Sequence, residues 1–142
     1  MSAPDTVAFT YRRRVEFADT DAAGMVHFSV FFRYMEESEH AVWRSAGMDI
    51  FASHETNSWP RISAHFDFKA PLRFQDEFEV RTEIAAVTRS TIQWSHVLTR
   101  GETRIGSGTI TTVYVSKARD GSIKSAEIPE GITSKLRAAL VS

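Results

Sequence analysis

Apolar and polar residues alternate along the first part of the chain. Between residues 7 and 17 every odd position is apolar except Arg13, and the even positions include Thr10, Arg12 and Glu16. A period of two places alternate side chains on opposite faces of a strand, so that one face is buried and the other meets solvent. The pattern therefore predicts a half-buried strand over residues 7–17.

A long helix is predicted after this strand. From residue 28 onward, apolar residues recur mostly at spacings of three and four, which form one buried stripe on a helix. Ser29 is suited to the N-cap and Gly47 to the position after the last turn. The predicted helix, residues 29–46, would be roughly 27 Å long. The polar residues on its opposite side are expected to face solvent: Arg33, Glu36, Glu37, His40 and Arg44.

Four further strands are predicted from alternation in the second half of the chain. Three of them centre on residues 62–68, 78–84 and 92–98. The fourth is expected at residues 104–116, where apolar residues fall on both parities, as is typical of a central strand covered on both faces. The connections are short, which favours antiparallel hairpins over helical crossovers. An amphipathic stretch at residues 130–140 predicts a short terminal helix.

The predicted order of elements is one strand, one long helix, four strands and a short helix. This order belongs to the α+β class, and a single helix packed against one curled antiparallel sheet of five strands would cover the apolar surfaces of both. The length of 142 residues and the 42% hydrophobic content favour one domain, residues 1–142. An open sheet leaves an edge, which pairing with a second chain could protect.

Composition narrows the classes of function. The 17 basic and 18 acidic residues give a formal net charge of -1, which offers no global attraction to nucleic acid or to an anionic membrane. The chain has no cysteine, so it has no disulfide, thiolate metal site or cysteine nucleophile, and it fits a reducing compartment. The N-terminal residues lack the pattern of a signal peptide, and no segment approaches membrane-spanning length. We therefore expect a cytoplasmic protein.

An acidic turn lies between the first strand and the helix. Asp19 and Asp21 stand two residues apart and Gly24 follows them. Both carboxylates could simply bond nearby backbone N–H groups of the turn. However, the first N–H groups of a helix lack partners and can hold a developing oxyanion. A carboxylate beside them could orient a water molecule or attack a carbonyl itself, so either aspartate could serve an acyl-transfer site.

Residues 15–28 resemble the signature of hotdog-fold acyl-CoA thioesterases of the 4-hydroxybenzoyl-CoA thioesterase type. The shared pattern is a strand, D-x-D-x-x-G, two apolar residues, aromatic residues and a helix. Residues 19–24 are also similar to 1,4-dihydroxy-2-naphthoyl-CoA hydrolases, and a weaker likeness continues through residues 65–76. The resemblance implies a hotdog fold, hydrolysis of an acyl-CoA thioester without a metal or other cofactor, and a homodimer or homotetramer with active sites at the subunit interface.

The resemblance also implies site residues. Carried over by position, the catalytic carboxylate falls on Asp21, as nucleophile or general base, and the backbone N–H at Phe28 holds the thioester oxygen. Asp19 is left as a scaffold of the turn. Many members of the family carry Asn or Ser followed by Tyr early in the helix, whereas this chain has Val30 and Phe31. Two alternatives stay open, namely a non-catalytic dimer that binds acyl-CoA or a protein, and a hydratase or dehydratase.

Further candidates for substrate binding surround the turn or stand near strand ends. Gly24 belongs to the turn, His27 could orient substrate or water, and Phe31 and Trp59 could line an acyl pocket. The coenzyme A phosphates need cations, for which the candidates are Lys69, Arg73, Arg89 and Arg104. No histidine spacing resembles a metal site.

Glutamates on the helix raise the question of a second carboxylate. Glu36, Glu37 and Glu39 could supply an acid from the helix. Their helical spacing from Arg33, His40 and Arg44 instead favours a solvated face with ion pairs.

Overall fold

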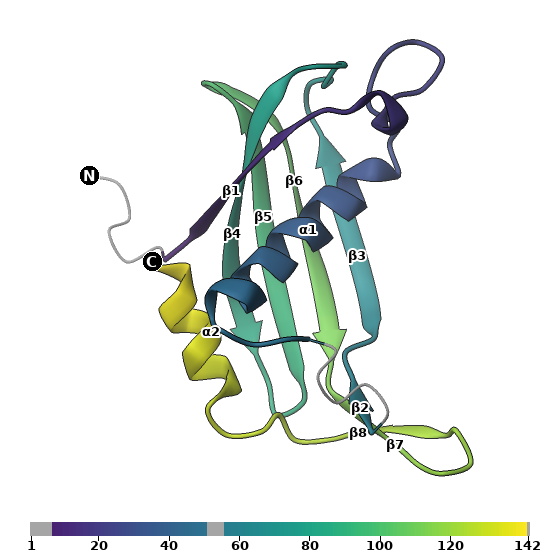
Figure 1. Cartoon of the computed structure of the whole chain (residues 1–142), viewed down its shortest axis with the longest axis vertical. Coiled ribbons are helices and arrows are strands. Elements are labelled where there is room, and N and C mark those ends of the chain that lie inside the picture. The colour runs from purple at the N-terminus through teal and green to yellow at the C-terminus, as the bar shows by residue number, and fades with distance from the viewer. Residues whose placement is uncertain (1–6, 51–55, 142) are drawn as a thin grey trace.

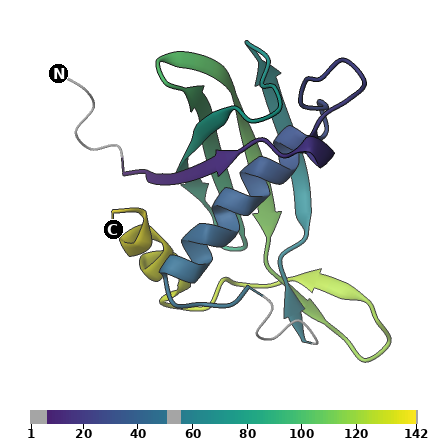
Figure 2. The same cartoon turned by 45° about the horizontal axis from the view of Figure 1, so that its top comes forward.

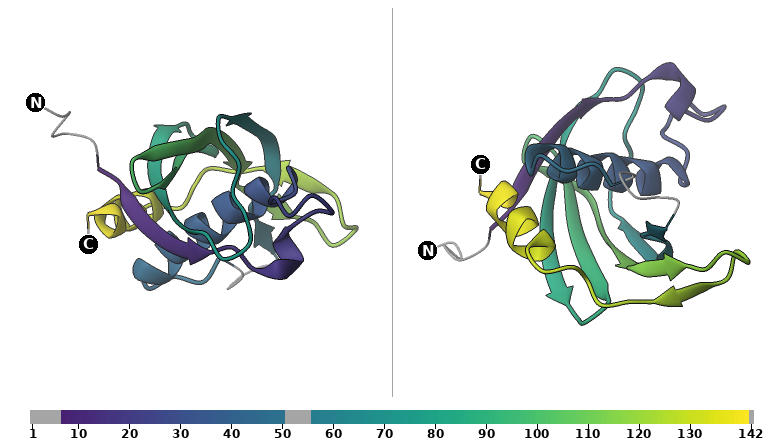
Figure 3. Two further views of the ribbon diagram at one scale, coloured as in Figure 1. Left: turned by 90° about the horizontal axis from the view of Figure 1, so that it is seen from above. Right: turned by 60° about the horizontal axis from the view of Figure 1, so that its bottom comes forward.

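The computed structural model describes residues 7–50 and 56–141. The first five residues, whose pattern differs from that of a signal peptide, lie outside the described residues. One antiparallel sheet has the strand order β1-β4-β5-β6-β3, and helix α1 crosses one face of it diagonally (Figure 1). Seen from above, the sheet curls around α1 (Figure 3). The predicted α+β architecture of five strands around one long helix is confirmed. The five strands are β1 (Phe9–Arg14), β3 (Arg61–Phe68), β4 (Glu77–Val87), β5 (Thr91–Arg100) and β6 (Thr103–Val113).

Helix α1 spans Val30–Ser45, one residue shorter at each end than predicted. Ser29 stands at the N-cap but its side chain makes no capping hydrogen bond. Gly47 follows the helix with a φ of +74°, the left-handed conformation that glycine supplies at helix ends. Tyr34, Met35 and Val42 are fully buried, so the inner stripe of the helix forms the centre of the core.

The first strand is shorter than predicted, because the chain turns inward after Arg14. A 3-10 helix, Phe17–Asp19, replaces the end of the expected strand. Val15 is buried, whereas Phe17 is 76% exposed, so the alternation does not continue to residue 17. The turn brings the carboxylate of Asp19 into the interior, where it meets Arg13 on β1.

The last strand ends earlier than predicted, and its second face is half-buried instead of fully covered. Buried residues of β6 alternate with half-buried ones, although β6 lies between β5 and β3. The two parities arise from a break at Tyr114, whose N–H bonds the carbonyl of Ser90 at 2.7 Å. After this break, β7 (Val115–Lys117) joins β2 (Asn57–Ser58) and β8 (Ile123–Ser125) in a second sheet, which extends away from α1 (Figure 2).

The predicted terminal helix is present as α2 (Ile132–Leu140). It packs beside the C-terminal half of α1 (Figure 1), where Leu136 and Leu140 join a buried cluster with Val42, Trp43 and Trp94. Neither of the helices that the structure describes is long and apolar enough to cross a membrane.

Strand β3 forms one edge of the main sheet and is poorly covered. The predicted apolar face of this strand contains Ile62, Ala64, Phe66 and Phe68, but only Phe66 is buried. Ile62 is 60% exposed and Phe68 is 51% exposed. Within one chain, therefore, the apolar side chains of this edge remain in contact with solvent.

Gly108 on β6 has no room for a side chain. An added Cβ would meet the carbonyl oxygen of His65, and it would lie 2.8 Å from Phe66 Cδ1 and 2.9 Å from Met35 Sδ. We expect Gly108→Ala to lower the free energy of unfolding by about 1–3 kcal/mol through overpacking. Urea denaturation measures this loss. Ser107→Ala is the neighbouring control, and a Gly108→Ala variant as stable as the wild type would contradict the close packing.

Candidate active site

Asp21 lies in a tight turn at the end of the molecule where α1 begins. Its N–H donates to the carbonyl of Met25 at 2.7 Å, and the N–H of Gly24 donates to the carbonyl of Asp21 at 3.0 Å. Oδ1 of Asp21 accepts from the N–H groups of Ala23 (2.8 Å) and Met25 (3.3 Å). Gly24 has a φ of +81°, which a glycine adopts without strain. One carboxylate oxygen thus holds the turn, and the side chain remains exposed to solvent.

The second arm of this turn is fixed to the loop that follows β3. The N–H of Val26 donates to the carbonyl of Leu72 at 2.8 Å, and Met25 forms an antiparallel bridge with Arg73. Thr20 and Val26 form a further bridge that joins the two arms of the turn. Arg73 is therefore brought beside the turn that carries Asp21.

Phe28 stands two residues before the first residue of α1. The N–H of Val30 donates to the carbonyl of His27 at 2.9 Å, which bends the chain into the helix. Among the residues that the structure describes, none accepts a hydrogen bond from the Phe28 N–H. This group lies at the positive end of the α1 dipole, so it is suited to hold an oxyanion.

Phe28 also lines an apolar pocket of about 310 Å³. Phe31 stacks on Phe66 with ring centroids 5.0 Å apart and meets the ring of Phe68 edge-on at 5.4 Å. Lys69 is the charged residue of the lining. The pocket can take an apolar or aromatic group and offers one cation at its rim. Its lining comprises Met25, Val26, Phe28, Phe31, Phe68, Lys69, Ala70 and Pro71.

His27 is exposed and is held against the start of the helix. Its Nδ1 lies 2.8 Å from Ser29 Oγ, and its ring lies 4.7 Å from the ring of Phe28, centroid to centroid. The imidazole is thus next to the predicted oxyanion site, and its role stays a prediction.

A family model described as the thioesterase-like superfamily matches residues 15–136. The chain belongs to this superfamily. Over 73 residues it is 34% identical to the 1,4-dihydroxy-2-naphthoyl-CoA hydrolase of Crocosphaera subtropica, and the match covers 50% of this chain and 53% of that protein. The chain therefore spans about half the length of this curated relative.

Two solved structures extend the comparison to nearly the whole chain. A protein of Aquifex aeolicus superposes with a TM-score of 0.82 at 29% identity, covering 90% of this chain and 98% of that one. A gentisyl-coenzyme A thioesterase superposes with a TM-score of 0.76 at 29% identity, covering 92% of this chain and 98% of that one. The predicted hotdog fold and the resemblance to thioesterases are confirmed.

In this member of the superfamily, three of the four predicted phosphate-binding cations lie at the same end as Asp21. Lys69 follows β3, Arg73 bridges Met25, and Arg104 opposes Thr99 at the same end of the sheet. All three are exposed. Arg89 lies in the β4–β5 hairpin at the opposite end, where its carbonyl accepts from the Ile128 N–H. Within one chain, Arg89 is therefore separated from the other three.

Trp59 is also remote from Phe28 within one chain. Its ring packs against Trp43 (5.5 Å between centroids) and Tyr114 (4.9 Å), beside the C-terminal half of α1. There it lines a different pocket of about 430 Å³ together with Glu36, His40, Ile50, Ser58, Pro60 and Arg61.

The expectation of a solvated glutamate face is wrong for Glu39. Its carboxylate is 1% exposed, accepts from Trp43 Nε1 at 3.1 Å and lies 3.0 Å from Arg61 Nη2. The contact with Arg61 lacks hydrogen-bond geometry, so it is a contact of charges. Burial raises the pKa of Glu39 to about 7, although Arg61 and the indole N–H oppose this. Glu39 stands four residues after Met35 and four before Trp43, so the sequence places it on the apolar stripe of the helix. This spacing is the feature of the sequence that indicates its burial.

Asp19 is likewise buried, in a network of polar groups. It accepts from the Tyr34 hydroxyl at 2.8 Å and from Arg13 Nη1 at 3.0 Å. Burial alone would raise the pKa of Asp19, but bonds from the Glu16 N–H, Tyr34 and Arg13 lower it below its ordinary value. In the sequence, Arg13 is the feature that indicates this network, because it is the one charged residue among the apolar odd positions of the first strand.

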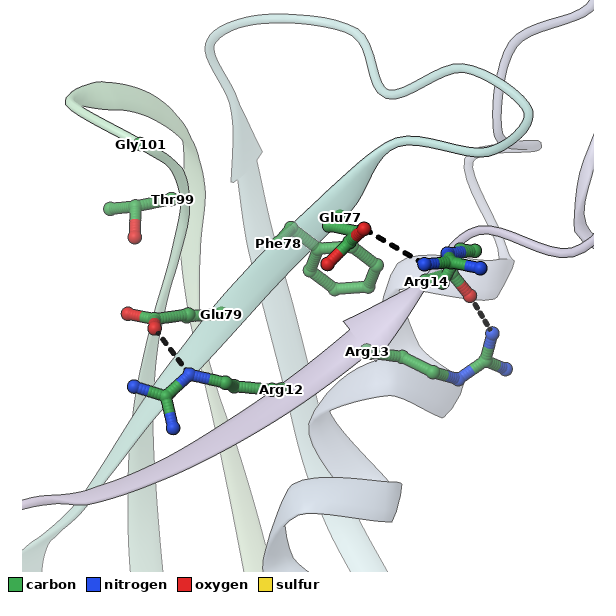
Figure 4. A pocket seen from close by; sticks show the side chains of 8 residues that line it. All are labelled: Arg12, Arg13, Arg14, Glu77, Phe78, Glu79, Thr99 and Gly101. Carbon is green, nitrogen blue, oxygen red and sulfur yellow. Dashed lines mark hydrogen bonds and ion pairs between the residues drawn. The ribbon is translucent and has the colours of Figure 1, made fainter.

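A further pocket, of about 480 Å³, lies over β1 and β4 (Figure 4). It contains three consecutive arginines, and each is held by a carboxylate. Arg12 pairs with Glu79 at 2.9 Å and Arg14 with Glu77 at 2.8 Å, whereas Arg13 turns to the other face of β1. These pairs neutralise the cations, so we assign no anionic ligand to this pocket. The described residues contain no group of three or more His, Asp or Glu side chains that could hold a metal ion.

Proposed function

We propose that this protein hydrolyses the thioester bond of an acyl-CoA, with Asp21 as the catalytic carboxylate and the Phe28 N–H as the oxyanion donor. The observation that carries the proposal is the Phe28 N–H at the start of α1, which has no acceptor among the described residues. Phe28 follows the Asp21 turn and lines an apolar pocket. Oδ1 of Asp21 is occupied by two N–H groups of the turn, and the exposed carboxylate can orient water or attack the thioester carbonyl.

The reaction requires a nucleophile, a donor that stabilises the oxyanion, and cations that bind coenzyme A. As the nucleophile adds to the carbonyl carbon, the carbonyl oxygen of the thioester gains negative charge. The Phe28 N–H and the α1 dipole stabilise this charge. The tetrahedral intermediate then expels the thiolate of coenzyme A. If water is the nucleophile, this step leaves the free acid; if Asp21 is the nucleophile, it leaves an acyl-aspartate anhydride, which water then hydrolyses to the free acid. Lys69, Arg73 and Arg104 lie at this end of the chain and are proposed to bind the phosphates of coenzyme A.

We propose an aromatic acyl group as the substrate. The pocket is surrounded by the rings of Phe28, Phe31 and Phe68, which favour an aromatic ring in offset or edge-on contact. Two similar proteins are named for aromatic acyl-CoAs, the 1,4-dihydroxy-2-naphthoyl-CoA hydrolase and the gentisyl-coenzyme A thioesterase. A cytoplasmic location agrees with such a substrate and with the absence of cysteine.

A thiol-release assay over aromatic, short-chain and long-chain acyl-CoAs tests the proposal. We expect the highest kcat/KM with an aromatic acyl group. Binding of acyl-CoA without hydrolysis of any substrate would favour the non-catalytic alternative. A change in enoyl-CoA absorbance without thiol release would instead favour a hydratase.

We also propose that two copies pair through β3. The exposed Ile62 and Phe68 stand on an edge strand, and an antiparallel partner would cover them and satisfy the edge N–H and carbonyl groups. Such pairing would bring the Trp59 end of one copy beside the Phe68 end of the other, because the strands run in opposite directions. A tetramer would form by association of two such dimers.

Ile62→Lys tests this pairing. The chain has a mass of 16.0 kDa, so light scattering should give about 32 kDa or a multiple for the wild type and about 16 kDa for the variant, because a lysine would be buried at the interface. Ile123→Lys is the matched control, since Ile123 is also exposed but lies on β8. A monomeric wild type, or an Ile62→Lys variant of unchanged mass, would exclude pairing through this edge.

A further inference from the structure

Asp19 is a buried carboxylate with its hydrogen bonds satisfied. Oδ2 accepts from three donors that come from three different segments, namely Arg13 Nη1 (3.0 Å), the Glu16 N–H (3.0 Å) and the Tyr34 hydroxyl (2.8 Å). Arg33 Nη1 lies 3.6 Å from the other oxygen. A carboxylate is costly to bury unless such partners compensate it, so the donors fix both its position and its ionised state.

The backbone of Asp19 closes the loop that carries Asp21. The carbonyl of Asp19 accepts from the His27 N–H at 2.9 Å, and the bridge between Thr20 and Val26 follows immediately inside this bond. The loop of residues 20–26 is therefore closed at its base by Asp19, while Val26 and Met25 also hold its second arm to Leu72 and Arg73. Asp21 lies within the loop that the bond between Asp19 and His27 closes, and Phe28 follows directly after His27 in the sequence.

Arg13 connects the closure to α1. Its guanidinium makes two parallel bonds to Glu37, Nε to Oε1 at 2.9 Å and Nη2 to Oε2 at 3.1 Å, while Nη1 reaches Asp19. The same guanidinium lies 5.0 Å from the centre of the Tyr34 ring. Only an arginine has the planar fork that can hold two carboxylates in this way. Strand β1, helix α1 and the loop are thus joined by one set of side chains.

We propose that Asp19, Tyr34 and Arg13 are positioning residues for thioester hydrolysis, which set the Asp21 carboxylate relative to the Phe28 N–H. The inference rests on the proposed function. None of the three faces the pocket beside Phe28, so they act through the backbone of the loop. A displacement of about 1 Å between reacting groups can lower a rate by as much as 10²-fold, so loosening this closure should reduce kcat more than it affects substrate binding.

Tyr34→Phe is the sharpest test, because it removes one hydroxyl and leaves the ring in place. We expect kcat for thiol release to fall about tenfold or more with KM within about twofold of the wild type. Tyr11→Phe is the matched control, since the Tyr11 hydroxyl bonds Glu37 at 3.0 Å and makes no bond to Asp19. Its kcat should stay within about twofold of the wild-type value.

Hydrogen exchange gives a second readout that does not depend on activity. The His27 amide donates to the Asp19 carbonyl, so its exchange should accelerate in Tyr34→Phe and in Arg13→Lys but not in Tyr11→Phe. Arg13→Lys keeps the charge and loses the fork, which maintains the test if Tyr34→Phe folds poorly. Tyr34→Phe and Arg13→Lys variants with wild-type kcat and wild-type exchange at His27 would overturn the inference. A wild type that hydrolyses no thioester would contradict the proposed function, while the exchange data would still test the loop.

Discussion

Asp21→Asn is expected to lower kcat for thiol release by about 10²–10⁴-fold, the range for loss of a catalytic acid or base. The amide cannot accept a proton from water and is a poor nucleophile towards a thioester. Its carbonyl oxygen can still accept from the Ala23 and Met25 N–H groups, so the turn should keep its shape. The assay uses the best aromatic acyl-CoA, and a thermal melt confirms that the variant is folded.

The chain offers a matched control for this substitution. Asp120 also uses its carboxylate to cap a turn, accepting from the Ser122 N–H at 2.9 Å, but it lies in the β7–β8 hairpin of the second sheet. Asp120→Asn should leave kcat unchanged. If Asp21→Asn retained wild-type kcat, the catalytic carboxylate would have to be sought elsewhere, and Glu39 would be the next residue to replace.

The second large effect concerns stability and pH. Burial raises the pKa of Glu39 from 4.5 to about 7 in the folded protein. An acid with a raised folded pKa contributes stability that is fully present below its unfolded pKa and is lost as pH rises through the folded value. Between pH 5 and pH 8 the loss amounts to about 2–3 kcal/mol, since one pKa unit corresponds to about 1.4 kcal/mol.

Glu39→Gln removes this titration. We expect its free energy of unfolding relative to the wild type to rise by about 2–3 kcal/mol from pH 5 to pH 8, measured by urea denaturation. Taking the difference cancels the opposite contribution of buried His96, whose pKa is lowered to about 3 by burial, with a smaller effect of Arg61. Thr112→Val is the control, because it removes a buried hydrogen bond from a hydroxyl to the Ile92 carbonyl, neither of which titrates. An equal difference at both pH values would mean that Glu39 is ionised as readily in the fold as in the unfolded chain.

Periodicity predicted the elements, since it depends on local spacing alone. The helix was placed to within one residue at each end because Ser29 and Gly47 mark its limits. The same rule placed two ends wrongly. Residue 17 lies in a 3-10 helix, and the final strand breaks at Tyr114, because partners distant in the sequence determine both features.

The buried polar groups were the hardest part to predict. The sequence does not show that Glu39 on the helix meets Arg61 on β3, or that Asp19 meets Tyr34. A charged residue on an apolar stripe is compatible with solvent until its partner is known. By contrast, the Asp21 turn and the Phe28 N–H are adjacent in the chain, so their proximity could be predicted from sequence. The types of Trp59 and Arg89 suggest substrate binding, but their types do not indicate position. Within one chain, both residues lie away from Asp21 and Phe28.

The two edges of the main sheet differ in a way that limits assembly. Strand β1 carries Arg12 and Arg14 on one face and Arg13 on the other, and charges of this kind discourage a further strand from adding. Strand β3 instead presents Ile62 and Phe68. If two copies pair only through β3, the same surface of each copy forms the interface, and the two β1 strands become the outer edges of the combined sheet. A sheet built in this way stops at ten strands and cannot grow into a fibre.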